Sequence, residues 1–220
     1  MNPIRRSLIA AATAALTLAT VPPVLAQEAQ PAPAEQMPEG KILEDITLGQ
    51  ADAPVTVIEY ASFTCSHCRA FHEENWPKLK AEYIETGKVK FIQRDVYFDA
   101  VGLWAGILAR CGGDAKYYAV SDLIFDDQQT WLNAKTGDEI AANLRKVGAK
   151  AGMTEPQMDA CWADKQKVAD LVATFQKNAT ADKIEGTPTF IIGGETVQNQ
   201  PWDDLKKIID AKIAEAEKKG

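Results

Sequence analysis

The feature that most constrains this chain is the C-x-x-C motif at Cys65–Cys68, which stands between a predicted strand and a predicted helix. Residues Val55–Tyr60 are rich in β-branched side chains and follow Pro54, a pattern typical of a buried strand. Residues Arg69–Thr86 place apolar side chains at helical spacing among charged ones. A helix N-terminus stabilises an anion through its free N–H groups and its dipole, so a cysteine there ionises readily. The motif therefore predicts a redox pair, with Cys65 exposed and reactive and Cys68 buried one turn further on.

Other uses of a C-x-x-C pair fit this sequence less well. A structural zinc site needs four ligands, and the chain has no second C-x-x-C motif. The two cysteines with His67 and His72 on about two helical turns make a poor tetrahedral set, so we expect no metal. We interpret His72, next to Glu73, as a solvated helix residue. Covalent haem attachment requires histidine directly after the second cysteine, where this chain has arginine.

The first 26 residues have the pattern of a cleavable export signal. Arg5 and Arg6 supply the positive start, Leu8–Leu18 is apolar, and a small-residue site predicts cleavage after Ala26. The apolar run is too short to remain as a membrane span. Residues 27–40 are rich in Pro and Ala and are interpreted as a flexible leader. We therefore expect an exported protein, in the periplasm.

Charge and cysteine count narrow the class further. The net charge is −7 at pH 7 and no basic stripe is visible, which argues against nucleic acid or an anionic membrane as the main partner. Four cysteines are too few for a disulfide scaffold, but an even number in an oxidising compartment suggests two pairs. The length is sufficient for one domain with its own core.

The remaining chain alternates between strand-like and helix-like patterns. Pro77 is expected to kink or break the helix after the motif. Helical spacing then fills residues 99–184, where Thr154 and Gln157 form a predicted capping box. Further predicted elements are a short first strand at Ile42–Leu48, strands at Val89–Val96, Thr187–Ile192 and Glu195–Gln198, and a last helix opened by Pro201.

This order of elements, with the C-x-H-C motif early and Gly186–Phe190 late, resembles the DsbA-like branch of the thioredoxin superfamily over about Ile42–Lys218. The resemblance implies an α/β thioredoxin fold, a central mixed sheet flanked by helices, with an inserted all-helical subdomain. The expected thioredoxin-fold domain is residues 41–98 and 185–220, and the expected helical insert is residues 99–184.

The resemblance also implies roles for individual residues. Pro188 would be cis and lie beside the reactive cysteines, and Thr187 would present its backbone to the substrate chain. Glu59, six residues before Cys65, would shuttle protons for the buried cysteine, whereas in a half-exposed strand it would be a surface residue. His67 would donate a hydrogen bond or partial charge to the Cys65 thiolate, or be an exposed turn residue without a role.

Cys111 and Cys161 both lie on apolar helical patterns of the expected insert. Buried free cysteines are common enough to be the simpler interpretation. Two lone thiols in an oxidising compartment tend to pair, however, and some relatives of the DsbA type carry a second disulfide here. We predict a structural disulfide between Cys111 and Cys161.

Together these observations predict an enzyme, a dithiol oxidase that introduces disulfides into secreted proteins through Cys65–Cys68 and needs no cofactor. Reduced or unfolded secreted proteins would be its substrates, and the resemblance implies a membrane quinone-linked partner that reoxidises it. The short segment before Lys41 cannot form the dimerisation domain of isomerases, which favours a monomer. Ser-His between the cysteines and Thr187 before the proline depart from the best-known oxidant. A disulfide isomerase or reductase therefore stays open, as does a non-redox metal-handling or chaperone module.

Overall fold

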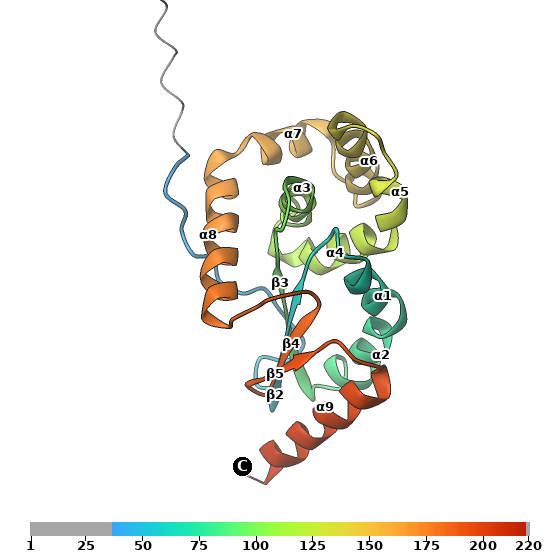
Figure 1. Cartoon of the computed structure of the whole chain (residues 1–220), viewed down its shortest axis with the longest axis vertical. Coiled ribbons are helices and arrows are strands. Elements are labelled where there is room, and N and C mark those ends of the chain that lie inside the picture. The colour runs from blue at the N-terminus through green and yellow to red at the C-terminus, as the bar shows by residue number, and fades with distance from the viewer. Residues whose placement is uncertain (1–36, 219–220) are drawn as a thin grey trace, which may run out of the picture. The chain divides into compact units, whose positions relative to one another are not determined.

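A five-stranded mixed sheet forms the centre of the fold in the computed structural model, which describes residues 37–218 (Figure 1). The predicted export signal and most of the predicted leader lie outside these residues. Strands β2 and β3 are parallel, and the other neighbours are antiparallel, in the order β1-β3-β2-β4-β5. The strands are β1 (Thr47–Leu48), β2 (Val55–Ala61), β3 (Val89–Asp95), β4 (Thr189–Ile192) and β5 (Glu195–Gln198).

The prediction for the first strand was largely wrong, because only Thr47–Leu48 pairs with β3. Upstream, the chain runs along a long helix of the insert, whose side chains satisfy the backbone in place of a neighbouring strand. The Lys41 N–H donates to Asp170 at 2.7 Å, and the Leu43 N–H donates to Thr174 at 2.9 Å. Gly40 approaches this helix so closely that a Cβ atom would lie 2.2 Å from the Ala169 carbonyl oxygen. The end of the predicted flexible leader is therefore docked.

Helices cover both faces of the sheet and one of its ends. The helix after the motif is interrupted at Asn75, just before Pro77, as predicted, and the capping box at Thr154 is confirmed. The helices are α1 (Ser66–Glu74), α2 (Trp76–Leu79), the π-helical turn η1 (Lys80–Ile84), α3 (Ala100–Ala109), the 3-10 turn η2 (Asp114–Lys116), α4 (Tyr117–Asp126), α5 (Gln128–Leu132), α6 (Gly137–Lys150), α7 (Glu155–Ala163), α8 (Lys165–Ala181) and α9 (Trp202–Glu217).

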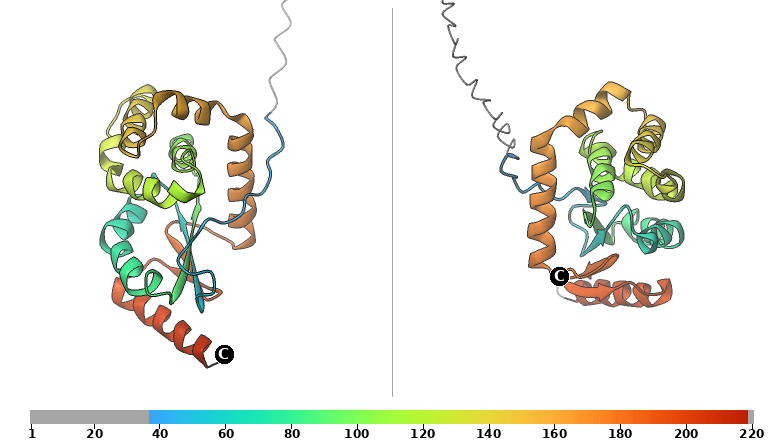
Figure 2. Two further views of the ribbon diagram at one scale, coloured as in Figure 1. Left: turned by 180° about the vertical axis from the view of Figure 1, so that it is seen from behind. Right: turned by 45° about the horizontal axis from the view of Figure 1, so that its top comes forward.

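Two hydrophobic cores result from this arrangement. The first lies between the sheet and the helices α1, α2 and α9, and contains Val57, Phe91, Phe190, Phe71, Leu79 and Ile209. The second lies within the helical block and contains Cys68, Leu108, Ile124, Trp131, Leu144 and Met158. Figure 2 shows α3 to α7 gathered at one end of the sheet, away from α9. The fold is thus the predicted thioredoxin fold with an all-helical insert, and α1 lies where the two cores meet.

Candidate active site

Cys65 is the N-cap residue of α1, at the end of a tight turn that follows β2. Its backbone is extended, and its sulfur accepts the Cys68 N–H at 3.4 Å. The turn is held by a backbone hydrogen bond from Cys65 N to the Ser62 carbonyl oxygen at 3.1 Å. The Thr64 hydroxyl donates to Asp99 at 2.9 Å, which ties the turn to the start of α3. The half-buried Cys65 sulfur is thereby placed at the positive end of a helix dipole.

The two sulfurs of the pair, which are free thiols in this structure, have opposite environments. Hydrogen bonding with the Cys68 thiol, then with the Thr187 side chain and with the backbone N–H groups of Cys68 and His67, lowers the pKa of Cys65 to about 5 against the opposing effect of burial. Cys68 has 0 % of its surface exposed. Burial raises its pKa well above the ordinary value, and the Cys65 hydrogen bond and the Glu59 charge raise it further. At neutral pH the pair therefore carries one thiolate, on Cys65.

The peptide bond between Thr187 and Pro188 is cis and lies against this sulfur. The Cys65 thiol donates to the Thr187 carbonyl oxygen at 3.4 Å. The loop is fixed just before β4 because the Thr189 hydroxyl donates to the Gly186 carbonyl oxygen at 2.8 Å. The structure therefore brings residues 187–188 to Cys65 although more than a hundred residues separate them in the chain.

Glu59 lies beneath α1 and is fully buried, with 0 % exposure. Residues on a strand alternate between faces, so Glu59 shares the core face with Val55 and Val57. Its carboxylate oxygen Oε2 lies 3.2 Å from His72 Nε2, while Oε1 has no partner. The prediction of a solvated His72 was wrong, because the residue is only 5 % exposed.

Helical geometry explains the position of His72. It follows Cys68 by four residues and therefore lies on the same face of α1, the face turned toward the sheet and α4. Its ring stacks on Phe125 with 3.9 Å between ring centres. The i, i+4 spacing from Cys68 was the signal in the sequence that pointed to burial.

His67, between the two cysteines, is exposed. Among the hydrogen bonds of residues 37–218, none involves its ring, while its backbone N–H is the last of the contributions that lower the pKa of Cys65. The ring borders a surface hollow of about 570 Å³ whose other wall includes Pro201 and Trp202 at the start of α9.

Gln128, at the start of α5, is a site residue that the sequence did not reveal. Its side chain is 3 % exposed and its amide nitrogen donates to the carbonyl oxygens of Phe63, at 2.8 Å, and Cys65, at 3.0 Å. The insert thus holds the turn in front of α1. No local pattern signals this contact, because it joins residues 63 positions apart.

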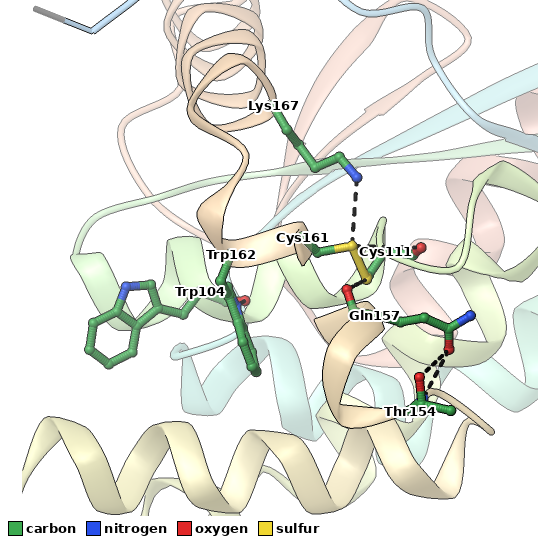
Figure 3. The surroundings of a disulfide bond; sticks show 7 residues. All are labelled: Trp104, Cys111, Thr154, Gln157, Cys161, Trp162 and Lys167. Carbon is green, nitrogen blue, oxygen red and sulfur yellow. Dashed lines mark hydrogen bonds between the residues drawn. A yellow bond between two sulfur atoms is a disulfide. The ribbon is translucent and has the colours of Figure 1, made fainter. Parts of the chain in front are cut away.

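A disulfide joins Cys111 and Cys161, with an S–S distance of 2.03 Å across a separation of 50 residues (Figure 3). Cys161 lies in the last turn of α7, as its helical pattern predicts. Cys111 does not lie in a helix, because α3 ends at Ala109 and the chain turns there. The Lys167 ammonium group donates to the Cys161 sulfur at 3.8 Å.

Neither a metal site nor a membrane span stands out in the part of the chain that the structure describes. Within residues 37–218, no three His, Cys, Asp or Glu side chains come together in an arrangement that could bind a metal ion. None of the described helices combines the length and the apolar character needed to cross a bilayer.

Comparison with known proteins agrees with this geometry. A thioredoxin family model matches residues 41–211. A putative protein-disulfide oxidoreductase of Rickettsia bellii is 31% identical over 194 residues, which cover 84% of this chain and 74% of that protein. The chain spans 62% to 64% of the counterparts from four other Rickettsia species. The disulfide bond formation protein D of Bacillus subtilis is 25% identical over 175 residues, 76% of either chain.

Among solved structures, Wolbachia pipientis alpha-DsbA1 superposes with a TM-score of 0.73 at 26% identity, covering 82% of this chain and 96% of that one. With the family model and the helix-capping cysteine pair, this match shows that the chain belongs to the DsbA-like branch of the thioredoxin superfamily. By class it is a thiol–disulfide oxidoreductase.

Proposed function

We propose that this protein is a dithiol oxidase that introduces disulfide bonds into exported proteins. The observation that carries the proposal is the asymmetry of the pair: the pKa of Cys65 is about 5, whereas that of Cys68 is raised by burial. A stabilised Cys65 thiolate stabilises the reduced enzyme and makes its disulfide a stronger oxidant. Each pKa unit below the ambient pH adds about 30 mV, so a pKa two units below pH 7 adds about 60 mV.

The reaction follows from this asymmetry. A substrate thiolate attacks the accessible Cys65 sulfur, the Cys65–Cys68 bond breaks, and a mixed disulfide forms while the electron pair goes to Cys68. A second substrate thiolate then attacks the substrate sulfur of the mixed disulfide. The substrate leaves with its new disulfide, and Cys65 leaves as the thiolate that the helix N-terminus stabilises.

The residues around the pair have separate tasks in this proposal. Thr187 offers its backbone to an extended substrate segment, and cis Pro188 keeps that backbone beside Cys65. Glu59 exchanges the proton of Cys68, since its charge acts on that thiol from the buried side. His67 contributes its backbone N–H to the Cys65 thiolate and presents its ring to the substrate side.

The setting of the reaction is part of the same proposal. The predicted export signal with cleavage after Ala26 would deliver the protein to the periplasm, where its substrates are reduced secreted proteins. A membrane partner that passes electrons to quinone would restore the Cys65–Cys68 disulfide. We propose that the enzyme acts as a monomer without a cofactor.

The test is the reduction potential of the Cys65–Cys68 pair, measured by equilibrating the purified protein with glutathione. A dedicated oxidant has a potential near or above about −150 mV. A potential of about −200 mV or below would instead favour the isomerase or reductase that Thr187 leaves open. The absence of a redox transition would remove the enzymatic function altogether.

A further inference from the structure

The buried Glu59–His72 pair is placed where the proton of Cys68 must go. Glu59 comes from β2 and His72 from α1, and both side chains are buried, with 0 % and 3 % exposure. His72 Nε2 and Glu59 Oε2 are 3.2 Å apart. The Glu59 charge acts directly on Cys68, which lies one turn before His72 on the same helix.

Each member of the pair has one polar atom that nothing in the described chain satisfies. Glu59 Oε1 and His72 Nδ1 are both buried without a hydrogen-bond partner. Gln93 lies opposite Glu59 on β3, but its amide nitrogen donates to Asp95 at 3.1 Å. Orphaned buried polar atoms are rare, because each costs the free energy of removing it from water. Two such atoms on one hydrogen-bonded pair leave two places at which a proton can be taken up.

We propose that Glu59 and His72 hold, as one pair, the proton that Cys68 takes up when it is expelled from the disulfide and gives up when it attacks. The proposal rests on the proposed function and deepens it. Expulsion of Cys68 leaves a buried thiolate, which receives a proton from Glu59, and His72 resupplies that proton through the Nε2–Oε2 hydrogen bond. In the reverse direction Cys68 gives its proton to Glu59, and Glu59 passes a proton on to His72. The His72 ring is then an imidazolium beside the Glu59 carboxylate. The pair then carries no net charge while Cys68 carries one negative charge.

Asp122 of α4 is a half-buried carboxyl on which the charge of His72 acts. Burial raises the pKa of this half-buried carboxyl, whereas the charge of His72 and a 2.9 Å hydrogen bond from Trp76 lower it. Of the charged groups on the elements packed here, Glu59 of β2 lies 3.2 Å from the ring. Lys80 of η1 and Asp126 of α4 act, like His72, on Asp122, and the Arg69–Glu73 pair lies on α1 itself.

His72 acts on Cys68 through Glu59, so we assign it as a positioning and proton-holding residue and not as a catalytic one. The alternative is a purely packing role, since the ring stacks on Phe125 and lies edge-on to Phe71. The substitution His72→Phe keeps an aromatic ring at this position but has no nitrogen that binds a proton. His72→Gln keeps a hydrogen-bond donor for Glu59 but likewise cannot carry the proton.

The experiment follows the reduced protein as it reacts with an aromatic disulfide such as 5,5′-dithiobis(2-nitrobenzoate). Cys65 attacks first and releases one coloured thiolate, and Cys68 then closes the disulfide and releases a second. We expect His72→Phe and His72→Gln to slow the second phase by about 10²-fold near neutral pH. We also expect the variant rate to keep rising with pH where the wild-type rate is level, because hydroxide replaces the lost acceptor. The second phase of the wild type, but not the first, should slow in heavy water.

Matched controls separate this role from packing and from the proposed function. Phe125→Leu weakens the stacking but keeps both proton-binding groups, so it should lower the melting temperature and leave the pH profile of the second phase unchanged. Glu59→Gln combined with His72→Phe should slow closure no more than the larger single effect, because residues acting as one unit are not additive. A first phase that is slow at about pH 6 would contradict the proposed function instead.

The proposal is overturned by a wild-type pH profile in His72→Phe and His72→Gln, by additive effects in the double variant, or by a second phase that does not slow in heavy water. The last measurement needs no variant, so it can still overturn the proposal if both substitutions prevent folding.

Discussion

The two cysteine pairs of this protein lie in opposite electrostatic settings. Cys65 caps the N-terminus of α1, where the helix dipole favours a thiolate. Cys111 and Cys161 both lie at helix C-terminal ends, just after α3 and in the last turn of α7, where the helix dipole disfavours a thiolate. Reduction therefore creates a stabilised anion in the first pair and an unfavourable one in the second. The contrast shows that direction along a helix, more than the presence of two cysteines, separates a reactive pair from a structural one.

The largest expected effect on activity is that of replacing Cys65, the sulfur that we propose to be reactive. Cys65→Ser should reduce oxidation of a reduced test protein to the uncatalysed background, because the remaining sulfur, that of Cys68, is buried and is not ionised. The measurement is the rate of disulfide formation in reduced ribonuclease. The matched control, Cys111→Ala with Cys161→Ala, should retain the activity. An oxidation rate that depends on the second pair instead would reverse the assignment of roles.

The next effect concerns the ionisation of Cys65. In the reduced protein its alkylation by iodoacetamide should reach half of its maximal rate at about pH 5 and fall below that pH as the thiolate is protonated. At about pH 6 its thiolate fraction should exceed that of an ordinary cysteine by about 300-fold. Peptide mapping should find Cys68 unmodified, because it is buried and its pKa is raised. A half-maximal rate near the ordinary cysteine pKa would show that the helix N-terminus stabilises nothing.

The sequence predicted a redox pair at Cys65–Cys68 because the signal for such a pair is local. A cysteine pair after a short β-branched strand and before a helical pattern specifies both the helix start and the dipole that acts on Cys65. The cis Pro188 lies far away in the chain, and only the resemblance to a known family connected it with the motif. Its place beside Cys65 is a product of strand pairing between β2 and β4.

What the sequence did not show were contacts made by ordinary polar residues across the fold. Gln128 reads as a polar residue at the start of a short helix, and its bond to the Cys65 carbonyl oxygen exists only because α5 packs against the turn. His72 was misjudged because its neighbours Glu73 and Glu74 are charged, although its spacing from Cys68 placed it on the inner face. Burial is decided by which face meets the sheet, and one charged stretch does not settle that.

Removing the second disulfide should affect stability far more than activity. Cys111→Ala with Cys161→Ala opens a loop of 50 residues, so we expect the free energy of unfolding to fall by about 2–4 kcal/mol. Urea titrations of both proteins with Cys65 and Cys68 kept reduced would measure the difference. Unchanged stability would mean that the bond constrains nothing that the second core does not already hold.

The smallest effect concerns the one feature of the second pair that resembles the first, a positive charge beside a sulfur. The Lys167 ammonium lies 3.8 Å from Cys161 Sγ and opposes the unfavourable C-terminal dipole when Cys161 leaves as a thiolate. An interaction of this kind near the surface is worth about 0.2–1 kcal/mol. Lys167→Gln should therefore slow reduction of the Cys111–Cys161 bond by dithiothreitol by about 1.5- to 5-fold, less so at high salt. Lys177→Gln, an exposed change on the same helix, serves as the control for net charge. Equal rates in the two variants would mean that helix direction alone keeps the second pair closed.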